Sequence, residues 1–128
     1  MNNLHFKVLK IKEFNNVVIS FLNQIEHVCK VSYTSQFKTI IENNNTLPID
    51  KFIAYAFPLR DKILKKDESY FYNTNLIESD DVSIMDQILN LKNIYSKLDE
   101  KSKNSIWNFI QAMLIISDEY VSLKLEKN

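Results

Sequence analysis

Residues 14–29, FNNVVISFLNQIEHVC, decide the fold, because their apolar side chains recur every three to four positions. At this spacing the apolar side chains share one face of an α-helix, and the polar ones lie away from its centre. The apolar members are Phe14, Val17, Val18, Phe21, Leu22, Ile25, Val28 and Cys29. The pattern predicts an amphipathic helix that buries one stripe.

The segment before this helix has two interpretations. Leu4, Phe6 and Val8 alternate with His5 and Lys7, which is the period of a short strand. The same residues could also form the beginning of the helix. The sequence leaves both structures open.

Downstream, residues 37–41 suggest a second helix that ends in the asparagine cluster 43–45. Thr46 offers a side-chain cap and Pro48 a first-turn proline for a third helix. Pro58 has no amide proton and disfavours helix in the residue before it, so this third helix should stop or kink near Phe57.

A further helical segment is expected over residues 59–66, followed by a break at residues 73–75. After the acidic side chains of residues 78–81, a stripe from Ile84 to Leu98 predicts another helix.

The last helix should be the centre of the fold. Asp99 can cap it, and its body contains IWNFIQAMLII (residues 106–116), which is apolar nearly all round. A helix of this kind is expected to be surrounded by others, with Trp107 in the core. We therefore predict an all-α fold, a compact single-domain bundle of about five to six helices over residues 1–128.

The composition excludes several classes of function. The chain has no glycine, which argues against phosphate-binding loops and dinucleotide-binding turns. Sixteen basic and sixteen acidic side chains balance, so no overall field attracts nucleic acid or anionic lipid. The single cysteine, and the lack of a signal peptide or membrane span, predict a soluble intracellular protein.

Catalytic and metal-binding constellations are missing from the pattern. His27 and Cys29 point to different sides of a helix, and His5 is the only other histidine. The acid pairs 67–68, 80–81 and 118–119 are adjacent residues, which do not face one point on a helix. We expect no enzyme activity, no cofactor and no metal.

Two weaker surface candidates remain. The first is a basic segment that could contact nucleic acid, formed by Arg60, Lys62, Lys65 and Lys66, with Lys101 and Lys103 as a smaller patch. The second is the aromatic triplet Tyr70, Phe71 and Tyr72, which could bind a partner. The alternative for both is a solvated helix face whose aromatic residues belong to the core.

Two blocks of sequence resemble a known group of proteins. One runs from PLRDKI (residues 58–63) into DESYF (67–71), and the other from LDEKSK (98–103) into Ile106-Trp107 and Tyr120. Together they resemble small, uncharacterised helical proteins of nucleocytoplasmic large DNA viruses. The resemblance implies a viral origin and a location in infected-cell cytoplasm or virion, and it supplies no catalytic residues.

The expected function is a non-enzymatic protein-protein interaction module, acting as an adapter, regulator or structural protein and able to form a homodimer. The alternative is an accessory nucleic-acid-binding protein that uses the basic segment 60–66. No membrane partner is expected. The sequence does not identify the partner, the oligomeric state or any ligand.

Overall fold

The computed structural model describes residues 3–29, 34–72, 95 and 97–125. None of these residues lies in a β-strand, and the elements they form are all helical, which confirms the predicted all-α fold. The elements are α1 (Asn3–Cys29), α2 (Thr34–Asn43), α3 (Leu47–Ala56), the 3-10 turn η1 (Phe57–Leu59), α4 (Arg60–Leu64), the 3-10 turn η2 (Glu68–Tyr72) and α7 (Glu100–Leu125).

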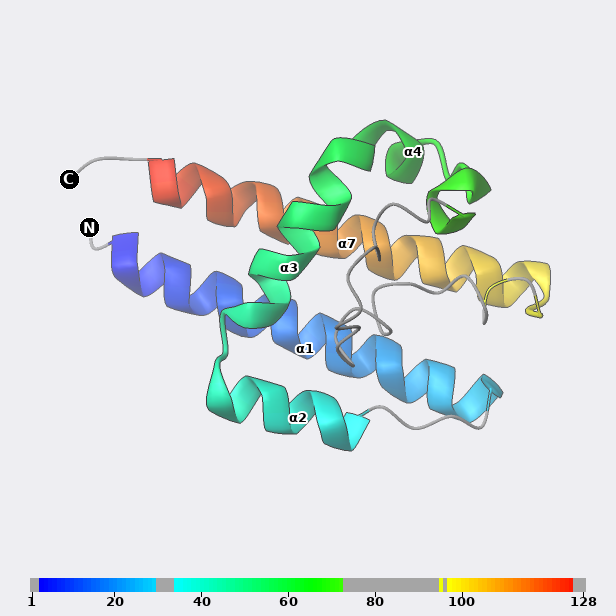
Figure 1. Cartoon of the computed structure of the whole chain (residues 1–128), viewed down its shortest axis with the longest axis horizontal. Coiled ribbons are helices and arrows are strands. Elements are labelled where there is room, and N and C mark those ends of the chain that lie inside the picture. Colours follow the sequence, from blue (N-terminus) through cyan, green and yellow to red (C-terminus); the bar gives the residue numbers. More distant parts are fainter. Residues whose placement is uncertain (1–2, 30–33, 73–94, 96, 126–128) are drawn as a thin grey trace.

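Two long helices form the frame of the molecule. α1 and α7 run antiparallel along each other, so the beginning of α1 and the end of α7 lie at the same end (Figure 1). α2 packs on α1, α3 crosses the pair and contacts both members, and α4 packs on α7. Across this described part of the chain, each helix is too short or too polar to span a bilayer.

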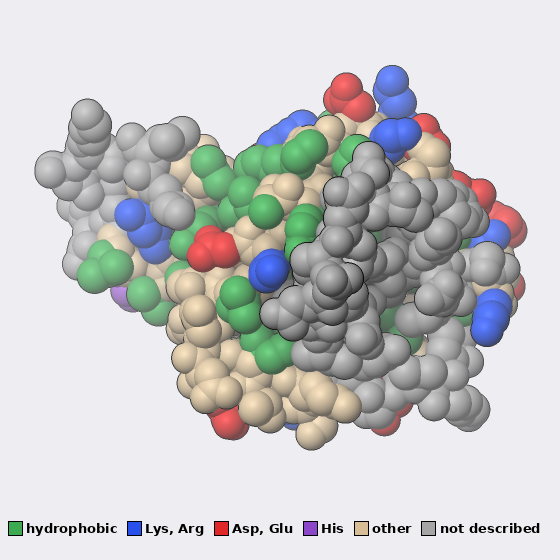
Figure 2. Space-filling view, in the orientation of Figure 1, with side chains coloured by type: hydrophobic (Ala, Val, Ile, Leu, Met, Phe, Trp, Pro, Cys, Tyr) green, Lys and Arg blue, Asp and Glu red, His purple; other side chains and the backbone are tan. Residues whose placement is uncertain are grey.

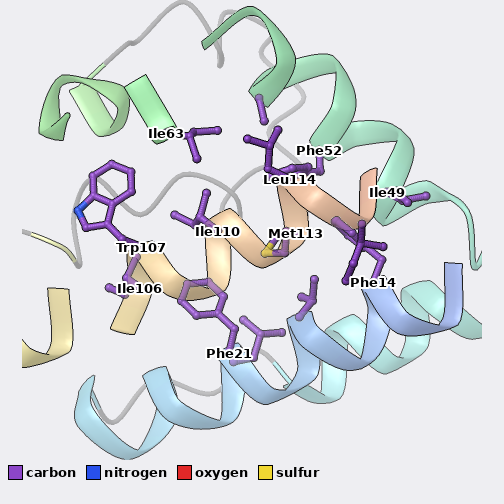
Figure 3. Close-up of a cluster of buried hydrophobic side chains, with 14 of the residues drawn as sticks. Phe14, Phe21, Ile49, Phe52, Ile63, Ile106, Trp107, Ile110, Met113 and Leu114 are labelled. Atoms are coloured by element: carbon purple, nitrogen blue, oxygen red, sulfur yellow. The ribbon is translucent and has the colours of Figure 1, made fainter. Parts of the chain in front are cut away.

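The core lies where α7 meets α1, α3 and α4 (Figure 3). The packing includes aromatic pairs, with ring centroids of Phe14 and Phe52 at 5.4 Å and of Phe21 and Phe109 at 5.3 Å. Trp107 is buried, as predicted. α7 contributes more of the buried core side chains than any other described helix, and they include Ile106, Trp107, Ile110, Met113 and Leu114. The C-terminal helix is therefore the central element, as its composition predicted.

The structure decides between the two interpretations of the N-terminal segment. α1 begins at Asn3, so residues 4–8 are helical and continue the amphipathic helix without a break. The alternation of Leu4, Phe6 and Val8 does not produce a strand.

The turn before α3 differs from the expected cap. Thr46 precedes α3 but has helical backbone angles, and its side chain makes no capping hydrogen bond. Its hydroxyl donates instead to Oδ1 of Asn44 at 2.8 Å. Pro48 does lie in the first turn, and α3 ends at Ala56, beside the predicted break at Phe57.

The predicted cap of the last helix is observed. Asp99 caps α7, because its Oδ1 accepts the amide N–H of Ser102 at 2.8 Å. Hydrogen bonding by Ser102 holds the pKa of Asp99 below its usual value. The helix expected over residues 84–98 lies outside the described residues apart from Tyr95, Lys97 and Leu98. The same is true of the acid pair at 80–81.

Helix α4 ends without glycine. Lys66 has a positive φ of 56°, the left-handed conformation that glycine usually supplies after a helix. Its amide N–H donates to the carbonyl of Ile63, and that of Asp67 donates to the carbonyl of Lys62. This pair of hydrogen bonds is the Schellman motif, formed here with lysine in the strained position.

Candidate functional site

Exposed apolar side chains are concentrated at the start of α1. Among the described residues, five large hydrophobic side chains are strongly exposed: Leu4 (64%), Val8 (52%), Leu9 (40%), Leu64 (58%) and Ile115 (61%). Three of these five lie within six residues of α1. In Figure 2, hydrophobic atoms reach the surface at the end of the molecule where α1 begins. We call Leu4, Val8 and Leu9 the α1 patch.

The exposure of the α1 patch follows from the lengths of the helices. α2 lies beside the middle of α1, and the first turns of α1 extend beyond it alongside the end of α7 (Figure 1). One turn further along α1, Ile11 is already buried. The apolar stripe of α1 therefore begins before α2 covers it.

A groove between α1 and α2 continues the α1 patch into the molecule. It has a volume of about 250 Å³, and Val8 belongs to both the groove and the patch. Its walls are mainly aliphatic, with amide side chains between them. The lining residues are Val8, Ile11, Lys12, Asn15, Asn16, Ile19, Ile41 and Asn45.

Asn15 is the buried polar group of this groove. Its Nδ2 donates to the carbonyl of Asn45 at 3.0 Å, which ties α1 to the turn after α2. Its Oδ1 is buried and accepts no hydrogen bond from the residues that the structure describes. Leaving a buried acceptor unpaired costs about 1–3 kcal/mol.

The charges around the α1 patch are basic. Lys10 is engaged within the fold, because its Nζ lies 3.1 Å from Oε1 of Glu119 and 3.3 Å from Oε1 of Glu13. The hydrogen bond to Glu119 is the main reason that the pKa of Lys10 is raised. Lys7 and Lys12 form no ion pair with any residue that the structure describes. Both ammonium groups remain available to an acidic partner.

The acidic pairs 67–68 and 118–119, His27 and Cys29, which were considered as catalytic or metal-binding groups, lie in the part of the chain that the structure describes. No three His, Cys, Asp or Glu side chains lie close enough there to hold a metal ion. The acidic pairs have structural roles: Asp67 accepts the N–H of Ser69, Asp118 binds Arg60, and Glu119 binds Lys10. His27 is exposed, and the side chain of Cys29 is outside the described residues.

The basic segment is partly engaged inside the fold. The guanidinium of Arg60 donates two hydrogen bonds of 2.6 Å to Asp118 and stacks on Phe57, with Cζ 4.6 Å from the ring centroid. Lys62 donates to the hydroxyl of Ser69. Lys65 and Lys66 are exposed. The structure thus leaves two of the four predicted cations on the surface without a described ion pair.

The aromatic triplet divides in the same way. Tyr70 is buried, and its ring centroid lies 6.2 Å from that of Trp107. Burial raises the pKa of its hydroxyl. Tyr70 therefore belongs to the core, which was the alternative considered for the triplet. Its side chain is not exposed to a partner. The side chains of Phe71 and Tyr72 lie outside the described residues.

A polar network holds the side chain of Trp107, at the end of the molecule opposite the α1 patch. Its Nε1–H donates to the hydroxyl oxygen of Tyr95 at 3.0 Å, and that hydroxyl donates to Oε1 of Glu68 at 3.2 Å. Lys103 lies over the ring of Tyr95, with Nζ 5.0 Å from the centroid, and 3.9 Å from Glu68. These contacts join η2 to α7, so we interpret them as structural.

Comparisons with known proteins add no information about these surfaces. No family model, curated protein or solved structure matches the chain.

The α1 patch was not predicted from the sequence. Leu4, Val8 and Ile11 continue the helical spacing of the 14–29 stripe, and this signal was available in the sequence. Their exposure was not, because it depends on where α2 ends beside α1.

Proposed function

We propose that this chain is a non-enzymatic helical interaction module that binds a protein partner through the α1 patch. The observation that carries the proposal is the concentration of exposed Leu4, Val8 and Leu9 at one end of a long helix. Apolar side chains that project beyond the core do not stabilise it. Clustered exposure of this kind is typical of interaction surfaces.

The size of the α1 patch limits the binding free energy that it can contribute. Complete burial of a leucine or valine side chain contributes about 1.5–3 kcal/mol. Scaled by their exposed fractions, the three side chains offer on the order of 3–4 kcal/mol together. A micromolar complex needs about 8 kcal/mol after the costs of association. The partner therefore has to use the neighbouring groove as well as the patch.

Nucleic-acid binding through the basic segment has weaker support. Arg60 and Lys62 already have partners within the fold, which leaves Lys65 and Lys66. Two phosphate contacts would give a dependence of log K on log salt with a slope of about −1.8, half that expected for four. A complex with so few phosphate contacts would be weak at physiological ionic strength.

Site-specific photocrosslinking tests the proposal. A photoreactive amino acid is placed at Leu4 or Val8 and, as matched controls, at the equally exposed Leu64 and Ile115. After illumination of producing cells, positions 4 and 8 are expected to yield a discrete crosslinked protein that Val8→Asp abolishes. Equal crosslinking at all four positions, or none at positions 4 and 8, would reject the α1 patch as the binding surface.

A further inference from the structure

A second groove, of about 450 Å³, lies between α1 and α7, and no charged side chain lines it. The uncharged surface is longer than the groove, because residues 14–25 of α1 and 104–117 of α7 carry no charge. Every exposed side chain of these stretches is an amide or a serine, except Ile115. Exposed helix positions are normally rich in charge, and depletion of charge is typical of the centre of an interface. We call this exposed surface the α1–α7 face.

Two opposite charges mark the ends of the α1–α7 face on α7. Lys101 and Glu119 are separated by about five turns of helix, so they lie on the same side of it. Ser105 and Ala112, which line the groove, lie between them. Lys101 is exposed, and the side chain of Glu119 remains 51% exposed in its ion pair with Lys10. The α1–α7 face is therefore positive at one end, neutral along its length and negative at the other end.

This distribution of charge is complementary to itself in the reversed direction. If α7 packs antiparallel to α7 of a second copy, Lys101 of each copy lies opposite Glu119 of the other. Parallel packing would place like charges opposite each other, which is unfavourable. The antiparallel register also places Ile115, which is 61% exposed, opposite Ser105 of the second copy. A protruding branched side chain thus meets a small one twice, once on each side of the two-fold axis.

The area of the α1–α7 face limits the strength of such a contact. The two uncharged stretches extend over about 20 Å, and two adjacent helices are about 20 Å wide, which gives about 400 Å² in each copy. A standard interface buries about 800 Å² per partner. The contact is therefore expected to dissociate in the micromolar range or above.

We infer that the α1–α7 face forms a weak homodimer in which the two α7 helices pack antiparallel about a two-fold axis. Ile115 of each copy packs on Ser105 of the other, and Lys101 of each copy pairs with Glu119 of the other. This face differs from the surface proposed for the partner, because Val8 lines the groove on the α2 side of α1. The dimer does not depend on the proposed function.

Sedimentation velocity of the full chain at about 5 to 500 µM tests the dimer. The wild type is expected to change from monomer to dimer within this range. Ile115→Lys should raise the dissociation constant at least tenfold, because the symmetric interface loses the apolar side chain twice and gains two ammonium groups. The matched control is Leu64→Lys, since Leu64 is 58% exposed, and it should leave the dissociation constant unchanged. Circular dichroism verifies that both variants keep their helical content.

The charges of the α1–α7 face have their own variants, measured at low ionic strength. Lys101→Glu should weaken the dimer about fivefold, since two exposed ion pairs become two repulsive ones. The control Lys65→Glu has the same change of net charge and should have a smaller effect. Adding Glu119→Lys to Lys101→Glu restores opposite charges across the interface and should recover the affinity.

Photocrosslinking from position 115 determines the register. In a mixture of isotope-labelled and unlabelled purified protein, a photoreactive amino acid at this position should crosslink to residues around Ser105 of the second copy. Positions 105 and 115 of one chain are about 15 Å apart along the helix, too far for a short photoreactive group. In producing cells, the product from position 115 has the mass of two chains, which distinguishes it from the partner expected at positions 4 and 8.

Several outcomes would overturn the inference. A chain that stays monomeric at every concentration has no such interface. A dimer that Ile115→Lys leaves intact, or that Leu64→Lys or Val8→Asp dissociates equally well, uses another surface. Crosslinks from position 115 to position 115 of the second copy would mean parallel packing. These results leave the α1 patch untouched, because crosslinking from Leu4 and Val8 tests it separately.

Discussion

Arg60 and Asp118 form a two-pronged clamp between α4 and α7. Each terminal nitrogen of the guanidinium donates a 2.6 Å hydrogen bond to a different carboxylate oxygen. Arg60 is the single arginine of the chain, and its planar group is suited to this fork-to-fork geometry as lysine is not. The proximity of Asp118 raises the pKa of Arg60, mainly through these hydrogen bonds.

A double-mutant cycle should measure this clamp. Both side chains are more than a third exposed, so solvent screening limits their coupling to about 1 kcal/mol or less. We expect Arg60→Gln and Asp118→Asn each to destabilise the protein, and the double variant to lose less than the sum. Urea unfolding followed by Trp107 fluorescence gives the free energies. A coupling that does not decrease at 1 M salt would contradict an electrostatic origin.

Replacing the strained lysine after α4 should stabilise the fold. Lys66 has a φ of 56°, which costs an L-residue about 1–2 kcal/mol and costs glycine little. After the greater chain entropy of glycine is subtracted, Lys66→Gly should raise the free energy of unfolding by about 0.5–1 kcal/mol. Lys65 has a φ of −90°, so the control Lys65→Gly should not stabilise. The melting temperatures of the two variants, compared with that of the wild type, test this prediction.

The stability of the core around Trp107 should depend on a single oxygen, the hydroxyl of Tyr95. Tyr95→Phe removes the hydroxyl to which Nε1 donates at 3.0 Å. We expect a loss of about 1–3 kcal/mol of stability, because a buried donor loses its partner. In a Trp107→Phe background the same change should cost less. Equal costs in both backgrounds, measured by circular dichroism during urea unfolding, would mean that the hydrogen bond contributes nothing.

The cap of α7 should make stability depend on acid pH. The amide of Ser102 lowers the pKa of Asp99 in the folded state, so the folded state binds a proton less readily than the unfolded chain. The stabilisation is therefore complete above the unfolded pKa of about 3.9 and is lost as the pH falls through the lower, folded value. Asp99→Asn does not titrate. The melting temperature of the wild type should fall toward that of Asp99→Asn as the pH is lowered from 5 to about 2.5. Parallel curves would contradict the assignment.

The sequence predicted the elements whose structure depends on near neighbours. The stripe of residues 14–29 became part of α1, Asp99 caps α7, and Pro58 interrupts the chain after α3. Each of these features is determined by side chains within a few positions of one another. Local spacing therefore contained the necessary information.

Features that depend on distant contacts were not predicted. Arg60 meets an acid 58 positions away, so its pattern suggested a free cation. One local contact was also not predicted: Thr46 bonds to Asn44 and does not cap α3, because its backbone is already helical. The α1 patch exists because α2 ends before the start of α1, and no pattern within residues 3–9 encodes where another helix stops.

The antiparallel arrangement of α1 and α7 also affects how the protein is handled in the laboratory. The beginning of α1 and the end of α7 lie at the same end of the molecule (Figure 1). An affinity tag fused near either end would sit beside Leu4 and Val8 and could block access to them. A cleavable tag that is removed before any assay would keep that end clear.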